Sequence, residues 1–134
     1  MPEATTRVLI VEDDRDFAES LAIALGTRKC AVEIAGSGEE ALRKFRSNRY
    51  DIAFMDIKLP GMNGVQSLAE ILQVVPEARI VMMTGFCEPT LLEQARRVGA
   101  ADVLCKPFRM RQLLGFIDQL REPPHSPPST PVCH

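Results

Sequence analysis

The sequence lacks several features that mark common classes of protein. It has no tryptophan and one tyrosine, so it offers no set of aromatic side chains on which nucleic-acid bases could stack. Its net charge of −2 also does not favour strong nucleic-acid binding. Both histidines lie in the last ten residues, and the four cysteines show no C-x-x-C spacing. We therefore expect neither direct nucleic-acid binding nor a zinc site.

The chain also lacks long hydrophobic segments. No apolar run approaches the roughly 18 residues that span a bilayer, and residues 1–7 contain no apolar core of a signal peptide. The expected compartment is the cytoplasm, without membrane association. The 134 residues suit one folded domain, which we place at residues 1–121. Residues 122–134 carry five prolines among polar residues, which predicts a disordered tail or linker.

Alternating hydrophobic patterns predict an α/β fold. Short apolar runs at 7–11, 31–35, 52–55, 79–83 and 101–105 indicate strands, and apolar residues at helical spacing lie between them. The run at 31–35 alternates with a charged residue, as an edge strand does. Strands that alternate with helices pair in parallel. We expect a flavodoxin-like, doubly wound sheet of five strands in the order 2-1-3-4-5, with five helices.

Reactive side chains follow four of these strands. Glu12 and Asp13 come after the first, Asp56 ends the third, Thr84 follows the fourth and Lys106 follows the fifth. Because the carboxyl ends of parallel strands share one edge, all five residues are predicted to meet there. Each residue alone has an ordinary explanation as a turn, helix-cap or surface residue. The predicted convergence is what favours a functional site.

The chemistry of this set favours phosphoryl transfer. Carboxylates that lie close together repel one another unless a cation is present. Oxygen ligands without cysteine or histidine favour Mg²⁺, with Mn²⁺ as a substitute. A lysine and a hydroxyl group suit contacts to phosphate oxygens. The set is consistent with transfer of a phosphoryl group onto Asp56.

The sequence resembles the response-regulator receiver domains of the CheY-like superfamily, which act in two-component phosphorelay signalling. The resemblance covers residues 7 to 121 and rests on four motifs in the same order and at similar spacing. These are Val11-Glu12-Asp13-Asp14, Met55-Asp56-Ile57-Lys58-Leu59-Pro60-Gly61-Met62-Asn63-Gly64, Met83-Thr84-Gly85, and Gly99-Ala100-Ala101-Asp102-Val103-Leu104-Cys105-Lys106-Pro107-Phe108.

The resemblance implies a role for each site residue. Asp56 is the expected phosphoacceptor, and Lys106 and Thr84 are expected to contact the phosphoryl group. Asp13, Glu12, Asp56 and the backbone carbonyl of Lys58 are the expected metal ligands. The bond between Lys106 and Pro107 is expected to be cis. A receiver of this kind catalyses only its own phosphorylation and dephosphorylation, so it is not expected to be an enzyme in the usual sense.

The resemblance also implies the partners. A histidine kinase or a phosphotransfer protein would supply the phosphoryl group. An output domain or target protein would read the switched surface, and a phosphorylation-dependent homodimer is one form of that output. One position departs from the family pattern: Val103 stands three residues before Lys106, where receivers usually have tyrosine or phenylalanine. Valine cannot supply the ring that usually moves with the threonine, so the output is expected to travel differently.

Two other functions fit part of the pattern. A metal-dependent phosphohydrolase with an aspartyl nucleophile usually has a second aspartate two residues later, but Lys58 stands there. A receiver-like module that only binds proteins would not need the complete set of acids, threonine and lysine. Turnover of a small phosphate ester would support the first alternative, and absence of Mg²⁺ binding would support the second.

Overall fold

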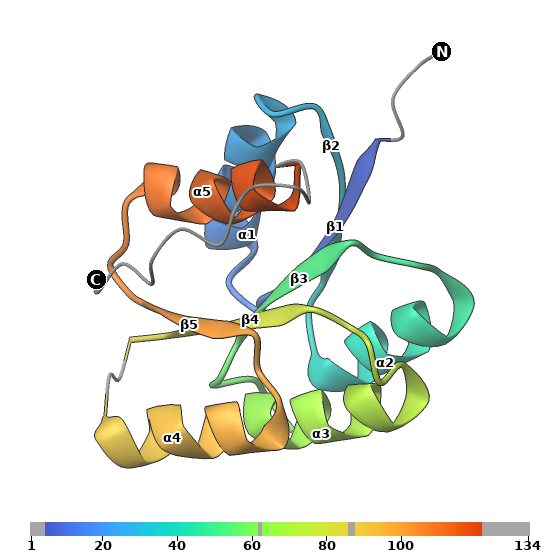
Figure 1. Cartoon of the computed structure of the whole chain (residues 1–134), viewed down its shortest axis with the longest axis vertical. Helices are drawn as coiled ribbons and strands as arrows, with labels where there is room; N and C mark the ends of the chain where they lie inside the picture. Colours follow the sequence, from blue (N-terminus) through green and yellow to red (C-terminus); the bar gives the residue numbers. More distant parts are fainter. Residues whose placement is uncertain (1–4, 62, 86–87, 122–134) are drawn as a thin grey trace, which may run out of the picture.

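A computed structural model describes residues 5–61, 63–85 and 88–121 of the chain. Five strands alternate with five helices in this part (Figure 1). The elements are β1 (Thr6–Val11), α1 (Arg15–Gly26), β2 (Cys30–Ala35), α2 (Gly38–Ser47), β3 (Ile52–Asp56), α3 (Gly64–Val74), β4 (Ile80–Thr84), α4 (Pro89–Val98), β5 (Asp102–Cys105) and α5 (Met110–Leu120). The predicted tail at 122–134 lies outside the described residues.

The strands form one parallel sheet in the order β2-β1-β3-β4-β5, which confirms the predicted topology. Helices α1 and α5 cover one face, and α2, α3 and α4 cover the other (Figure 1). Among the residues described, no helix is both long and apolar enough to span a membrane.

Burial on both faces explains the uninterrupted apolar strands. Every residue of β3 and β4 is buried, and successive side chains enter opposite cores. Ala53 and Met55 pack with α2, α3 and α4, whereas Ile52 and Phe54 pack with α1 and α5. Strand β2 is only partly buried, as expected for an edge strand.

Side-chain caps begin three of the helices. The Ser37 hydroxyl accepts a hydrogen bond from the Glu40 backbone N–H at 3.1 Å, which satisfies one of the free N–H groups at the start of α2. The Glu40 carboxylate returns to the N–H of Gly36 at 2.9 Å, one residue earlier than in a standard capping box. Asp14 caps α1, and Asn63 caps α3.

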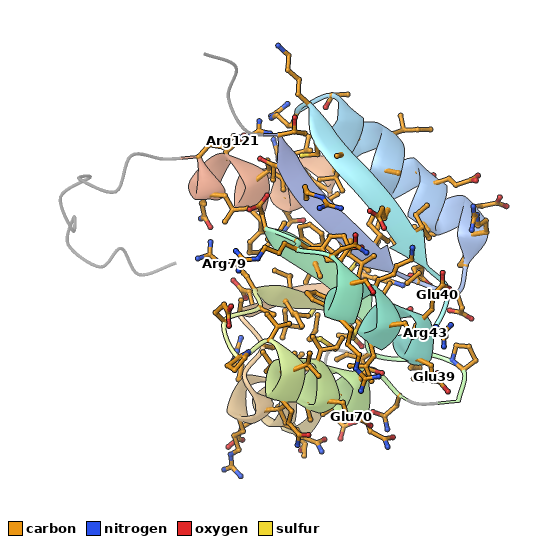
Figure 2. The ribbon with its side chains drawn as sticks, turned by 90° about the vertical axis from the view of Figure 1, so that its right-hand side faces the viewer. Glu39, Glu40, Arg43, Glu70, Arg79 and Arg121 are labelled. Carbon is orange, nitrogen blue, oxygen red and sulfur yellow. The ribbon has the colours of Figure 1, made fainter. Side chains whose placement is uncertain are left out.

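Charged side chains line the outer surface of α2, whereas α3 carries one charged residue, Glu70. Figure 2 shows Glu39, Glu40 and Arg43 on α2, toward the edge where the strands end. Arg79 and Arg121 lie near the opposite edge, where the strands begin. The Glu39 carboxylate lies near Gly61, which is in the connection between β3 and α3. Gly61 has a φ of +74°.

Candidate functional site

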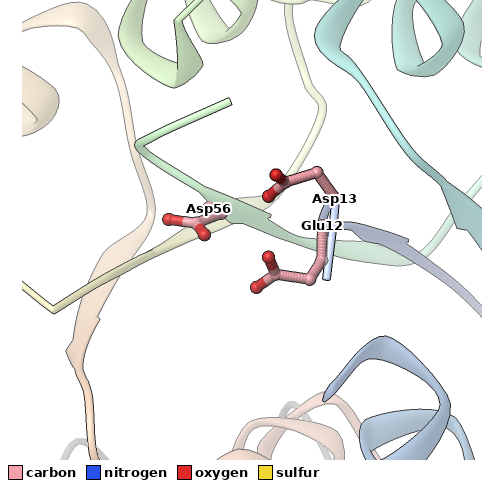
Figure 3. A group of neighbouring side chains, drawn as sticks. All are labelled: Glu12, Asp13 and Asp56. Carbon is pink, nitrogen blue, oxygen red and sulfur yellow. The ribbon is translucent and has the colours of Figure 1, made fainter. Parts of the chain in front are cut away.

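Three carboxylates meet at the carboxyl edge of the sheet. One oxygen each from Glu12, Asp13 and Asp56 forms a group whose members all lie within 4.8 Å of one another, and Figure 3 shows the three side chains gathered at this edge. Glu12 and Asp56 are 3% and 8% exposed, whereas Asp13 is exposed. The strands therefore bring together the acidic residues that the sequence pattern selected.

Lys106 closes the site from β5. Its Nζ lies 2.9 Å from Oε1 of Glu12 and 3.1 Å from Oδ2 of Asp56, and its side chain is a quarter exposed. The Lys106 backbone N–H donates to the carbonyl of Thr84 at 2.7 Å, which holds the end of β5 beside the end of β4. Thr84 is buried and is the last residue of β4, so the prediction that it follows this strand was wrong by one residue.

Backbone groups orient both buried carboxylates. Oδ1 of Asp56 accepts the N–H of Lys58 at 3.1 Å, and Oε2 of Glu12 accepts the N–H of Asp14 at 3.2 Å. Each carboxylate therefore has one oxygen on the backbone and the other on Lys106. This arrangement fixes the two carboxyl groups before any ligand arrives, which lowers the cost of binding.

Gly64 allows α3 to begin against the end of β3. Its N–H donates to the carbonyl of Ile57 at 2.7 Å. A Cβ at this position would lie 2.6 Å from the Cα of Ile57 and still closer to the carbonyl oxygen of Asp56. Any larger residue would push the helix away from the strand that carries Asp56.

The site carries more negative than positive charge. Burial raises the pKa of Glu12, and the charge of Asp56 adds to this; hydrogen bonds from Lys106 and Asp14 oppose it. Burial would lower the pKa of Lys106, but its bonds to Glu12 and Asp56 outweigh that effect and raise the pKa. Lys106 is therefore a stable cation that pairs with two carboxylates, and the third, Asp13, lies within 4.8 Å of those two. A second cation would relieve the remaining repulsion.

A residue outside the predicted set also contacts the site. The Nζ of Lys106 lies 4.6 Å from the centroid of the Phe17 ring, and this ring meets Phe108 edge to face at 6.0 Å. Phe17, Leu21 and Leu25 recur at four-residue spacing, which indicates only that Phe17 lies on the inner face of a helix. Nothing in the sequence indicates the contact, because Phe17 and Lys106 lie far apart in the chain.

Val103, Pro107 and Lys58 are three further positions that the sequence comparison singled out. Val103 is half-buried and packs against the core beneath α2, α3 and α4, so no ring occupies this position on β5. The Lys106–Pro107 bond is cis, as the resemblance implied. Lys58 is exposed, two residues beyond Asp56.

Comparison with known families decides the identity of the domain. The sequence profile of the response regulator receiver domain matches residues 8–118. The chain belongs to this family. Receiver domains are signalling modules of two-component systems rather than conventional enzymes.

Relatives of known name include small and large regulators. The chain is 32% identical over 117 residues to the chemotaxis protein CheY of Thermotoga maritima, covering 85% of this chain and 96% of that protein. It is 38% identical over 132 residues to the transcription factor SKN7 of Chaetomium thermophilum, covering 94% of this chain. The match spans 17% of that transcription factor and 45% of a receiver protein from Anaeromyxobacter. The chain thus corresponds to part of these two larger relatives.

Solved structures share the fold. A CheY-like receiver domain from Methanospirillum hungatei superposes with a TM-score of 0.83 at 31% identity, covering 87% of this chain and 93% of the other. A response regulator from Burkholderia pseudomallei with a phosphorylated aspartic acid, a calcium ion and citrate superposes with a TM-score of 0.77 at 29% identity. That match covers 82% of this chain and 65% of the other.

Proposed function

We propose that this receiver domain accepts a phosphoryl group on Asp56 from a phosphohistidine of a histidine kinase or phosphotransfer protein. A carboxylate oxygen of Asp56 attacks phosphorus, an O–P bond forms, and the N–P bond to histidine breaks. The histidine nitrogen leaves with the bonding electron pair and takes up a proton. The domain then returns to its starting state when water hydrolyses the aspartyl phosphate.

The observation that carries this proposal is the environment of Asp56. Its carboxylate is buried, is oriented by the Lys58 N–H, and lies 3.1 Å from the ammonium group of Lys106. A buried nucleophile beside a fixed cation suits a reaction in which negative charge gathers on phosphoryl oxygens. In this proposal Lys106 contacts one of those oxygens, and Thr84, at the end of the neighbouring strand, contacts another.

A divalent cation fits the acidic group. Glu12, Asp13 and Asp56 offer only oxygen ligands, and Asp13 opens the group to solvent. Such ligands suit Mg²⁺, with Mn²⁺ as a substitute. When bound, the ion would neutralise charge on the transferred group. We propose that Asp13, Asp56 and the Lys58 carbonyl hold it and that Glu12 assists.

We propose that phosphorylation switches a surface read by an output domain, by a target protein or by a second copy of the chain. A covalent group that interacts differently with two conformations shifts their populations. The reader, the cytoplasmic location and the division into residues 1–121 and a tail remain predictions. The membership in a signalling family makes the phosphohydrolase alternative less favourable.

The test is labelling with acetyl phosphate and Mg²⁺, followed by intact-mass and peptide mass spectrometry. Wild type should gain one phosphoryl group on Asp56, and Asp56→Asn should gain none. Removal of Mg²⁺ with EDTA should prevent labelling. Asp118→Asn is the matched control. Asp118 lies near the end of α5 and pairs with Arg28, just beyond the end of α1, whereas the start of α1 lies at the site. Equal labelling of wild type and Asp56→Asn would contradict the proposal.

A further inference from the structure

The ammonium group of Lys106 has a third neighbour besides the two carboxylates. Its Nζ lies over the Phe17 ring, 4.6 Å from the centroid. The same nitrogen is within hydrogen-bonding distance of Glu12 and Asp56. A cation over an aromatic face is attracted by the negative face of the ring. The ring therefore limits where the lysine can lie on the side of α1.

The chain holds this ring in place from two sides. Asp14 caps α1 by accepting the Phe17 N–H at 3.2 Å, and the Asp14 N–H itself donates to Glu12 at 3.2 Å. The backbone that carries Phe17 is thus tied to a carboxylate of the site. On the other side, the ring meets Phe108 edge to face, with an angle of 63° between the ring planes. Phe108 follows Lys106 by two residues. The Phe17 ring is therefore held by the chain segments that carry Glu12 and Lys106.

A lysine needs such support more than most side chains. Its flexible stem gives it many rotamers, and the Lys106 side chain is a quarter exposed. When a phosphoryl group arrives, the ammonium must turn toward a new oxygen without swinging into solvent. A ring that attracts the ammonium and shields one side of it reduces the alternatives, so less conformational freedom is lost on binding.

We propose that Phe17 is a positioning residue that holds Lys106 in reach of the phosphoryl group. This inference rests on the proposed function of Asp56 and Lys106, and it adds a residue that the site motifs do not contain. The ring acts through the lysine and does not touch the reacting atoms. Its electrostatic face, and not only its volume, is the property that matters.

The experiment compares an aromatic, an aliphatic and a control substitution. Phe17→Tyr keeps the ring, whereas Phe17→Leu keeps an apolar side chain without a ring. Phe116→Leu is the matched control, because Phe116 also lies on the α1 and α5 side and meets Phe54 edge to face at 6.0 Å. Phe17→Met serves as a second variant if Phe17→Leu does not fold.

The first measurement is the affinity for beryllofluoride, a phosphoryl mimic, at saturating Mg²⁺. Phe17→Leu should bind it roughly 2- to 30-fold more weakly than wild type, which is the range expected for loss of a cation–π contact. Phe17→Tyr should keep the wild-type affinity, and Phe116→Leu should leave it unchanged. The affinity for Mg²⁺ alone should be the same in all four proteins.

The second measurement is the NMR signal of the Lys106 ammonium group. Shielding by the ring should shift its protons upfield in wild type and Phe17→Tyr, and Phe17→Leu should remove the shift. Equal beryllofluoride affinity in wild type and Phe17→Leu would overturn the inference, as would equal loss in Phe17→Leu and Phe17→Tyr. If wild type itself failed to bind beryllofluoride, the proposed function would fail. In that case an unchanged Lys106 signal in Phe17→Leu would overturn the positioning role separately.

Discussion

Two groups of charged residues in this domain are built from similar parts but balance their charges differently. In the first, called here the Glu33 cluster, one carboxylate on β2 has three partners. Glu33 accepts hydrogen bonds from the Tyr50 hydroxyl at 2.8 Å, Arg7 at 3.2 Å and Lys44 at 3.3 Å. The Tyr50 bond, together with the Lys44 and Arg7 bonds, lowers the pKa of Glu33 in spite of partial burial.

The second group, called here the site cluster, has the opposite ratio. Glu12, Asp13 and Asp56 lie together with one lysine, Lys106, which pairs with Glu12 and Asp56, and the pKa of Glu12 is raised. In the Glu33 cluster the donors outnumber the carboxylate, so the folded chain satisfies it fully. In the site cluster the carboxylates outnumber the lysine, so part of the charge is left for a ligand to neutralise. The difference supports a structural role for the Glu33 cluster and the proposed binding role for the site cluster.

Removing the lysine from each cluster gives the largest expected contrast. Lys106→Met should lower the free energy of unfolding by about 2 kcal/mol in metal-free buffer, because buried Glu12 loses its cation. Lys44→Met should cost less than about 0.5 kcal/mol, since Glu33 keeps Arg7 and Tyr50. Urea unfolding near neutral pH measures both values. Similar losses in the two variants would show that the clusters do not differ in balance.

Removing a carboxylate should change stability in opposite directions. Glu33→Gln should lower the free energy of unfolding by about 1.5 kcal/mol, because three donors lose a charged acceptor. Asp13→Asn should raise it by about 0.5 kcal/mol without metal, because repulsion in the site cluster falls. The loss in Glu33→Gln should shrink as the pH falls below 4.5, the ordinary pKa, toward the lowered pKa of Glu33. Two changes of the same sign near neutral pH would contradict this account.

Magnesium should stabilise the domain through the site cluster alone. At ten times its dissociation constant, Mg²⁺ should add about 1.4 kcal/mol to the free energy of unfolding of wild type. The same concentration should add much less to Asp13→Asn, whereas Glu33→Gln should gain as much as wild type. Thermal unfolding with and without EDTA is the measurement. An equal gain in Asp13→Asn would place the ion elsewhere.

The Tyr50 hydroxyl should give the smallest effect. Tyr50→Phe should lower the free energy of unfolding by about 0.5 to 1 kcal/mol through loss of one hydrogen bond to Glu33. Burial, followed by the bond to Glu33, raises the pKa of Tyr50 to about 12 from its ordinary value of 10. The folded chain therefore keeps a proton that the unfolded chain loses, so this contribution is complete below pH 10 and disappears as the pH rises toward 12.

That pH dependence isolates the tyrosine. Other groups titrate in the same range, but they are common to wild type and Tyr50→Phe. The free energy of unfolding of wild type should therefore fall relative to that of Tyr50→Phe between pH 10 and 12, first removing and then reversing the difference between them. A constant difference across this range would show that the folded chain does not retain the Tyr50 proton.

Much of the fold and site was predictable because two simple rules apply. Hydrophobic spacing distinguishes strands from helices, and parallel pairing places all strand ends at one edge. Those rules alone place Glu12, Asp13, Asp56 and Lys106 at one edge of the sheet. The same rules do not give the ends of the strands. Thr84 belongs to β4, because its backbone continues the pairing with β5. An apolar pattern does not show where backbone pairing ends.

The tertiary structure alone decided which contacts surround these residues. Three contacts join segments that are distant in the sequence. They are the contact of Lys106 with the Phe17 ring, the contact of that ring with Phe108, and the bonds of three donors to Glu33. Such contacts depend on side-chain rotamers and on the packing of helices against the sheet, which carry no periodic signal. The sequence by itself determined the topology and the acidic edge of the sheet. Packing decided how the charges there are balanced and what holds the lysine.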